Sequence, residues 1–147
     1  KKVFLLGAGG VSSSIIYSLQ KMGAANITLT NRTKQKALEI KKNFQDLKIV
    51  DWGEIIDFDL IINATSLGLN KSDRIELDLN KNCSSKLFYD IIYNPNKTQF
   101  LKMGESKGSN IENGKLMFIY QAQLAFEVWH GIKPQIDIAT IKLLSDD

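Results

Sequence analysis

Residues 3–12 read Val-Phe-Leu-Leu-Gly-Ala-Gly-Gly-Val-Ser, an apolar run that ends directly in a glycine-rich turn. The apolar run is typical of a buried parallel strand, and helical spacing of apolar side chains begins immediately after the glycines. A strand, a tight turn and a helix in this order leave the first amides of the helix free to hold a phosphate. The stretch therefore predicts a βα unit that binds a nucleotide.

Further strands and helices are predicted to alternate along the chain. Short apolar or alternating runs predict strands over residues 27–30, 49–50, 59–63, 86–92 and 109–112. Apolar residues at helical spacing predict helices over residues 11–22, 33–47, 98–106 and 115–129, and Asp137 can cap a last one. The alternation predicts an α/β fold, Rossmann-like and doubly wound, in which a mostly parallel sheet carries helices on both faces.

Two segments stand out from this alternation. The helix over residues 115–129 has so few polar interruptions that we expect neighbouring elements to cover both of its sides. The polar segment 70–85 is expected to be a loop with at most one turn of helix.

Composition and charge restrict the classes of function. The 147 residues suit one domain, the net charge of +3 is low for a nucleic-acid binder, and no apolar run is long enough to span a membrane. The single cysteine, Cys83, excludes an internal disulfide. The sequence contains no cluster of metal ligands, and its one histidine, His130, is expected to be exposed or structural. We expect a cytoplasmic protein with a small-molecule ligand. The chain starts without Met and directly in a strand, so we expect a piece of something longer.

The polar turns that follow successive predicted strands start at Gly7, Asn31, Asn63 and Tyr93. In a doubly wound sheet the carboxyl ends of the strands lie at one edge, and ligands bind there. These four turns are therefore expected to line one site.

The first of these turns departs from the G-x-G-x-x-G pattern only where Ser12 replaces the third glycine. Gly7 suits the tight turn, Gly9 lets the backbone approach a pyrophosphate, and Ser12 is small enough for the helix to pack on the strand. Gly10 adds a further glycine beside the phosphate path. A plain βα turn without a ligand is the alternative.

The second turn bears on the choice of nucleotide. NAD-binding domains place Asp or Glu about 20 residues after the glycines, but Asn31, Arg32 and Thr33 stand here. Arg32 can hold a 2′-phosphate bidentately, and its two neighbours add neutral hydrogen bonds. Lys36 adds positive charge in the helix that Thr33 can cap, and is better placed than Lys34. The turn favours NADP, with a solvated basic helix start as the alternative.

Residues further along the chain indicate where the nicotinamide end of a dinucleotide and its substrate would bind. The loop over residues 63–68 carries small and hydroxyl side chains that can pass close to a nicotinamide and its ribose. Tyr93 lies in a turn stiffened by proline, and Met117 can pack on a flat ring. Gln121 interrupts an apolar helix, where a buried amide needs partners such as substrate hydroxyls. A capping turn and ordinary core positions are the alternatives.

Five motifs in series carry a resemblance to a known family. They are Gly-Ala-Gly-Gly at 7–10, Asn-Arg-Thr at 31–33, Asn-Ala-Thr-Ser-Leu-Gly at 63–68, Asp-Ile-Ile-Tyr-Asn-Pro at 90–95 and Asn-Gly-Lys-Leu-Met-Phe-Ile-Tyr-Gln-Ala at 113–122. Together they resemble the NADP-binding domain of shikimate dehydrogenase. The resemblance runs over almost the whole chain and implies reduction of 3-dehydroshikimate to shikimate by NADPH, in aromatic amino-acid (chorismate) biosynthesis.

The resemblance also implies which residues contact the cofactor and the substrate. It places the diphosphate on Gly7, Ala8, Gly9, Gly10 and Val11, the 2′-phosphate on Asn31, Arg32, Thr33 and Lys36, the nicotinamide half on Thr65, Ser66, Ile91, Gly114 and Met117, and substrate hydroxyls on Tyr93 and Gln121. Family members often carry a second Arg where Lys36 stands, so that part of the phosphate site is altered.

No catalytic residue is expected in this chain. The resemblance places the catalytic Lys and Asp in an N-terminal substrate domain, so residues 1–147 would form the NADP-binding domain alone. The final helix, over about residues 136–147, is expected to pack on that missing domain, which would share the substrate. We expect the chain by itself to turn over slowly or not at all. The oligomeric state stays open, with a homodimer among the options.

Three other readings stay open at this point. A quinate/shikimate-type dehydrogenase shares the fold but can accept NAD, which Arg32 without a nearby acid disfavours. Glutamyl-tRNA reductase can also show Asn-Arg-Thr, but the Tyr93 turn and the helix that follows Gly114 suit it less well. A stand-alone NADP-binding or regulatory module without chemistry is the third.

Overall fold

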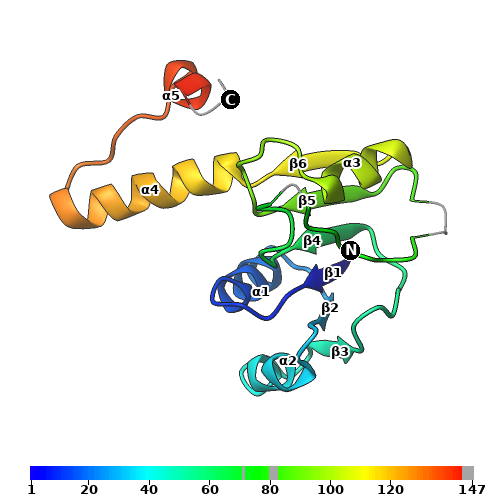
Figure 1. Cartoon of the computed structure of the whole chain (residues 1–147). Helices are drawn as coiled ribbons and strands as arrows, with labels where there is room; N and C mark the ends of the chain where they lie inside the picture. Colours follow the sequence, from blue (N-terminus) through cyan, green and yellow to red (C-terminus); the bar gives the residue numbers. More distant parts are fainter. Residues whose placement is uncertain (71, 80–82, 144–147) are drawn as a thin grey trace.

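The described residues, 1–70, 72–79 and 83–143 of a computed structural model, form a six-stranded sheet (Figure 1). Every strand pairing in this sheet is parallel, and the strand order is β3-β2-β1-β4-β5-β6. The strands are β1 (Lys2–Leu6), β2 (Asn26–Thr30), β3 (Lys48–Val50), β4 (Leu60–Asn63), β5 (Leu87–Asp90) and β6 (Asn110–Asn113). The predicted doubly wound parallel sheet is confirmed, and the order reverses between β1 and β4.

Helices cover both faces of the sheet. They are α1 (Ser12–Lys21), α2 (Lys34–Lys41), α3 (Gln99–Ser106), α4 (Lys115–His130) and α5 (Ile138–Leu143). One core cluster joins α1 and α2 to one face of the sheet, and a second cluster joins α3 to the other. The helices α4 and α5 extend away from the sheet (Figure 1).

The central strand β1 explains why its sequence is apolar without interruption. Val3 and Leu5 point into the cluster under α1 and α2, whereas Phe4 and Leu6 point into the cluster under α3. All four side chains are at most 2% exposed. A strand covered on both faces has no solvent side, so no polar alternation develops.

The described part of the connection from β4 to β5 is a loop, as predicted, but it is not polar throughout. Its described residues contain no helix, yet Ile75, Leu77 and Leu79 are buried and pack in the cluster under α3. The amide of Leu77 donates to the carbonyl of Ile75 at 3.1 Å, and that of Leu79 to Leu77 at 2.9 Å. An extended segment with every second side chain turned inward therefore covers the sheet where a crossover helix would usually lie.

Two predicted boundaries and one predicted helix cap need correction. The strand predicted over 86–92 ends at Asp90, where the chain leaves the sheet edge. The helix predicted over 33–47 ends at Lys41, although Leu47 is still buried in the core. Thr33 has the extended backbone of a cap residue, but among the described residues its side chain makes no capping hydrogen bond.

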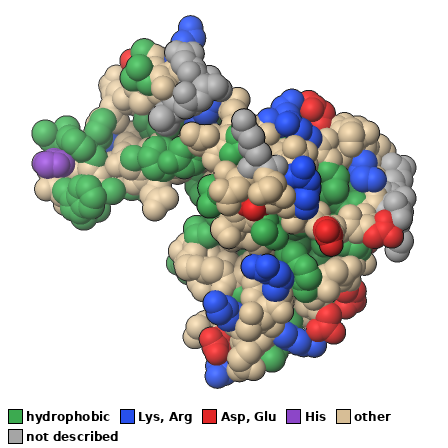
Figure 2. Space-filling view, viewed as in Figure 1, with side chains coloured by type: hydrophobic (Ala, Val, Ile, Leu, Met, Phe, Trp, Pro, Cys, Tyr) green, Lys and Arg blue, Asp and Glu red, His purple; other side chains and the backbone are tan. Residues whose placement is uncertain are grey.

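The expectation that α4 is covered on both sides is wrong for the described residues. Only Lys115 and Ile119 of this helix are buried, because α4 leaves the sheet after its first turns. Figure 2 shows apolar side chains gathered along the projecting helix. Its large exposed apolar residues are Leu116, Phe118, Tyr120, Leu124, Phe126, Val128 and Trp129. No helix in the described parts of the chain is both long enough and apolar enough to cross a membrane.

A substitution in the extended connection tests its contribution to the core. Leu77→Ala removes a buried side chain and is expected to lower the free energy of unfolding by about 2–4 kcal/mol. The neighbouring Glu76 is exposed, so Glu76→Ala should change it by less than about 0.5 kcal/mol. Urea unfolding followed by circular dichroism measures both variants. Equal stability of Leu77→Ala and the parent chain would show that the connection is an ordinary surface loop.

Candidate functional site

The carboxyl ends of the central strands are joined by backbone hydrogen bonds that continue past the sheet. The amide of Gly7 donates to the carbonyl of Thr30 at 2.8 Å, and the amide of Ala64 donates to that of Leu6 at 2.8 Å. Two pockets adjoin along this edge and share the wall formed by residues 64–66. The edge is the crevice in which ligands of doubly wound sheets bind.

The first pocket, of about 310 Å³, lies over the ends of β1, β2 and β4. Its lining residues are Gly7, Ala8, Gly9, Asn31, Arg32, Thr33, Lys36, Trp52, Ala64, Thr65, Ser66 and Leu67. The glycine turn and the Asn-Arg-Thr turn, predicted to meet, are therefore brought together. No acidic side chain is among these described lining residues, so the charge that the side chains bring to the pocket is positive.

The glycine turn is built around a close approach of two strands. Gly7 has φ +105°, and a Cβ there would lie 2.8 Å from the carbonyl oxygen of Ala64, so only glycine fits. The buried Ser12 hydroxyl donates to the carbonyl of Gly7 at 2.9 Å and accepts from the amide of Gly9 at 3.1 Å. The expectation that Ser12 fits in place of the third glycine is confirmed.

The amides of this turn differ in whether they have partners. The amide of Ala8 donates to the side-chain oxygen of Asn31 at 3.0 Å, and that of Gly9 to Ser12. No hydrogen bond from the amides of Gly10 and Val11 is found to any described residue. A Cβ on Gly10 would meet nothing within 4 Å. The turn thus leaves two successive donors at a helix N-terminus for an anion.

In the Asn-Arg-Thr turn, Asn31 holds the structure together and Arg32 supplies positive charge. The Asn31 side chain bridges the two turns, because it accepts from Ala8 and donates to the carbonyl of Thr33 at 2.9 Å. Arg32 and Lys36 are exposed and line the pocket. Lys34 forms an ion pair with Asp51 at 2.6 Å instead and is not among the lining residues.

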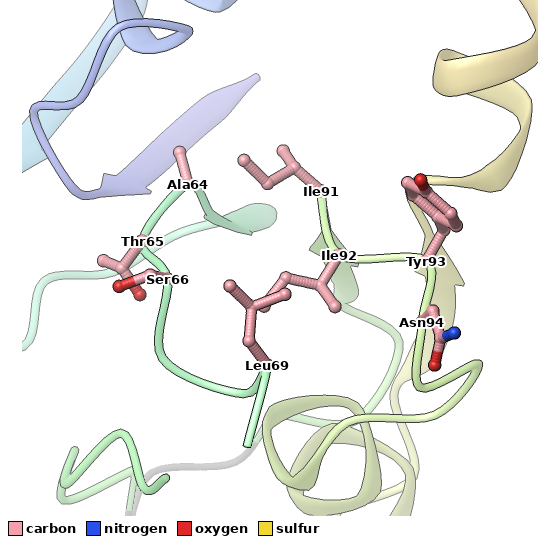
Figure 3. A pocket seen from close by; sticks show the side chains of 8 residues that line it. All are labelled: Ala64, Thr65, Ser66, Leu69, Ile91, Ile92, Tyr93 and Asn94. Carbon is pink, nitrogen blue, oxygen red and sulfur yellow. The ribbon is translucent and has the colours of Figure 1, made fainter.

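The second pocket, of about 420 Å³, lies between the loops that follow β4 and β5 (Figure 3). It is lined by Ala64, Thr65, Ser66, Leu69, Ile91, Ile92, Tyr93 and Asn94. The ring of Tyr93 stacks on Phe118 of α4 with 4.6 Å between the ring centroids. Apolar walls with hydroxyl groups from Thr65, Ser66 and Tyr93 suit a flat, partly polar ring.

The start of α4 is pressed against the loop that follows β5. The amide of Gly114 donates to the carbonyl of Ile92 at 3.3 Å, and a Cβ on Gly114 would lie 1.9 Å from the carbonyl oxygen of Ile91. Met117, one turn along, is half-buried. Gln121 is exposed, so the expected buried amide is wrong for the described residues.

A buried polar network behind the second pocket was not predicted from the sequence. Asn63 and Asp90 end neighbouring strands in register, and both are fully buried. The Asn63 amide donates to an Asp90 carboxylate oxygen at 3.0 Å, and the Thr98 hydroxyl donates to the other oxygen at 2.6 Å. Burial raises the pKa of Asp90, while hydrogen bonds from Thr98, Ile92 and Asn63 act to lower it. We call these three side chains the Asn63–Asp90–Thr98 network.

Other chemically reactive side chains lie away from these pockets. His130 is exposed at the end of α4, where its ring lies 4.4 Å from that of Phe126. Cys83 is a buried free thiol. Within the described ranges, no group of three His, Cys, Asp or Glu side chains is arranged to hold a metal ion.

A family model described as shikimate / quinate 5-dehydrogenase matches residues 1–99. The chain belongs to this family. The match does not separate the shikimate and quinate members, because one model describes both.

Curated relatives carry the name shikimate dehydrogenase (NADP(+)). The protein from Pelagibacter ubique is 54% identical over 144 residues, which make up 98% of this chain and 54% of that protein. The one from Caldicellulosiruptor bescii is 40% identical over 154 residues, covering 99% of this chain and 54% of its own. The chain therefore spans about half the length of the curated relatives it matches.

Solved structures of the shikimate/quinate dehydrogenase family have the same fold. Shikimate dehydrogenase from Aquifex aeolicus superposes with a TM-score of 0.85 at 33% identity, over 100% of this chain and 54% of that one. The Thermus thermophilus enzyme in complex with NADP(H) and shikimate gives 0.81 at 29% identity, over 97% of this chain and 53% of that one.

Alanine at position 114 tests the contact between α4 and the second pocket. Gly114→Ala must displace the backbone of residue 91, and we expect it to lower the free energy of unfolding by about 1–3 kcal/mol. Gly10→Ala, whose Cβ meets no described atom within 4 Å, should change it by less than about 0.5 kcal/mol. Thermal and urea unfolding of both variants provide the measurement. Unchanged stability of Gly114→Ala would contradict the close approach.

Proposed function

We propose that this chain is the NADP(H)-binding half of a shikimate dehydrogenase, an oxidoreductase that reduces 3-dehydroshikimate to shikimate with NADPH. The observation that carries the proposal is the first pocket. It joins the glycine turn at Gly7, Ala8 and Gly9 to Arg32 and Lys36, with no acidic residue among its described lining. The next two amides of the turn, those of Gly10 and Val11, donate to no described residue. A carboxylate at the end of β2 would repel a 2′-phosphate, and Asn31 stands there instead.

The residues present fit the two ends of the cofactor. The amides of Gly10 and Val11 would donate to the diphosphate, and Arg32, Thr33 and Lys36 would hold the 2′-phosphate. Asn31 would act mainly by holding the glycine turn against the second turn, since both ends of its side-chain amide already have partners. The proposal therefore keeps the predicted cofactor residues and gives Asn31 a structural role.

The nicotinamide half would then enter the second pocket. When bound, the reduced nicotinamide supplies the hydride that the reaction needs. Thr65 and Ser66 line this pocket on the β4 side, and Ile91 and Tyr93 line it on the β5 side. Met117 is half-buried near the start of α4. In this arrangement the Tyr93 hydroxyl would meet the substrate, whereas Gln121 would reach it only from the exposed face of α4.

Catalysis would require a substrate domain that supplies the catalytic Lys and Asp. The row of apolar residues on α4 supports such a domain, because an apolar surface of this kind marks an interface. The segment after α4, including α5, would pack on the same domain. The end of the predicted final helix, residues 144–147, lies outside the described part. A closed cleft between the two domains would hold substrate and nicotinamide in contact and exclude water.

Arg32 provides the test of cofactor choice, and Lys34 provides its control. Arg32→Ala should weaken NADPH binding by about 10- to 100-fold, since a charge-assisted hydrogen bond is lost, and should leave NADH binding unchanged. Lys34→Ala removes a nearby lysine that pairs with Asp51 and lies outside the pocket, so its effect should be less than about twofold. Quenching of Trp52 and Trp129 fluorescence measures each affinity. Equal affinity of the parent chain for NADPH and NADH would overturn the assignment.

Turnover separates a half-enzyme from a complete one. The 147-residue chain should bind NADPH but oxidise it with 3-dehydroshikimate at a rate at least about 1,000-fold below that of an intact two-domain relative, because positioning and catalytic groups are missing. Absorbance at the NADPH maximum follows the reaction. A rate close to that of the intact relative would show that this chain contains the catalytic groups itself.

A further inference from the structure

The Asn63–Asp90–Thr98 network connects the two loops that form the second pocket. On the β4 side, the Asn63 side-chain oxygen accepts from the amide of Thr65 at 3.0 Å and from its hydroxyl at 2.7 Å. The Asn63 side-chain nitrogen donates to the carbonyl of Leu67 at 3.0 Å. Asn63 therefore fixes the fold of the loop that carries the hydroxyl-bearing wall.

On the β5 side, the Asp90 carboxylate fixes the other loop. One of its oxygens accepts from the amide of Ile92 at 3.0 Å and from the Asn63 side chain at 3.0 Å. Its second oxygen accepts from the Thr98 hydroxyl at 2.6 Å, and Thr98 in turn accepts from the amide of Leu101 as the cap of α3. The carboxylate is thus the point at which β4, β5, their loops and α3 are joined.

The three members of the network lie behind the pocket and do not line it. Neither pocket contains Asn63, Asp90 or Thr98 among its lining residues. Asp90 also bonds to no residue that lines the first pocket, because its partners are Asn63, Ile92 and Thr98. Burying a carboxylate costs free energy unless hydrogen bonds compensate for the lost hydration. The hydrogen bonds to Asp90 compensate for it, and they hold the two loops and α3 together.

We propose that the Asn63–Asp90–Thr98 network sets the separation of the 64–69 and 91–94 loops, so that they receive the nicotinamide half of the cofactor. Asp90 and Thr98 are then positioning residues for the nicotinamide and not for the adenosine end. The inference rests on the proposed function, because it takes the second pocket as the nicotinamide site. It extends that function by assigning a role to side chains that line neither pocket.

The test compares a whole cofactor with its adenosine end. Asp90→Asn keeps the side-chain shape but removes the charge and places an amide nitrogen against the Thr98 hydroxyl. It should weaken NADPH binding by about tenfold, while the affinity for 2′,5′-ADP, which lacks the nicotinamide, should change by less than about twofold. Isothermal titration calorimetry of the 147-residue chain gives both affinities, and circular dichroism verifies that the variant is folded.

A pair of substitutions at Thr98 keeps the test decisive if Asp90→Asn does not fold. Thr98→Val removes the donor to Asp90 and should weaken NADPH binding selectively. Thr98→Ser keeps the hydroxyl, so it should restore the affinity to within about twofold of the parent chain. A purely structural role in capping α3 would not change the ratio of NADPH to 2′,5′-ADP affinity.

The outcomes separate this inference from the proposed function. If the folded variants bind NADPH as tightly as the parent chain, or lose NADPH and 2′,5′-ADP affinity equally, the positioning role is overturned. If the parent chain binds neither ligand, the proposed function fails instead. The inference is supported if Asp90→Asn or Thr98→Val loses affinity for NADPH but not for 2′,5′-ADP, while Thr98→Ser keeps the NADPH affinity of the parent chain.

Discussion

The close approach between the turn at Gly7 and the carbonyl of Ala64 is the constraint on which both pockets depend. A side-chain carbon at position 7 would lie 2.8 Å from that carbonyl oxygen. Ala64 lines both pockets, so the contact fixes the wall that they share. Because β1 and β4 are neighbours where the strand order reverses, any widening here would separate the two halves of the crevice.

Neutral groups build this frame, and charged groups are left for the surface. Asn31 and Ser12 hold the glycine turn with uncharged hydrogen bonds, whereas Arg32 and Lys36 remain exposed. Neutral bonds can be buried at a moderate desolvation cost, and exposed cations keep their hydration until an anion arrives. Asp90 is an exception, and its carboxylate is surrounded by three donors.

What could be predicted from the sequence was local, and what could not depended on position in space. The strands followed from apolar runs, which both faces of the sheet bury. The glycine turn followed from its position after such a run, and the meeting of the Gly7 and Asn31 turns followed from parallel strands that end at one edge. Leu77 was missed because its two-residue alternation lies among acidic residues and forms no ladder. The pairing of Asn63 with Asp90 depends on the register of two strands that are far apart in sequence. The exposure of Gln121 depends on where α4 leaves the sheet.

The stacking of Tyr93 on Phe118 links the exposed helix to the second pocket. Phe118 belongs to α4, and its ring lies 4.6 Å from that of the pocket residue Tyr93. Gly114 presses the start of the same helix against the carbonyl of Ile91, so α4 cannot shift without moving the loop. Under the proposed function, a domain that packs on the apolar residues of α4 would therefore also fix the pocket wall. Closure of the cleft and preparation of the nicotinamide site would then be one structural event.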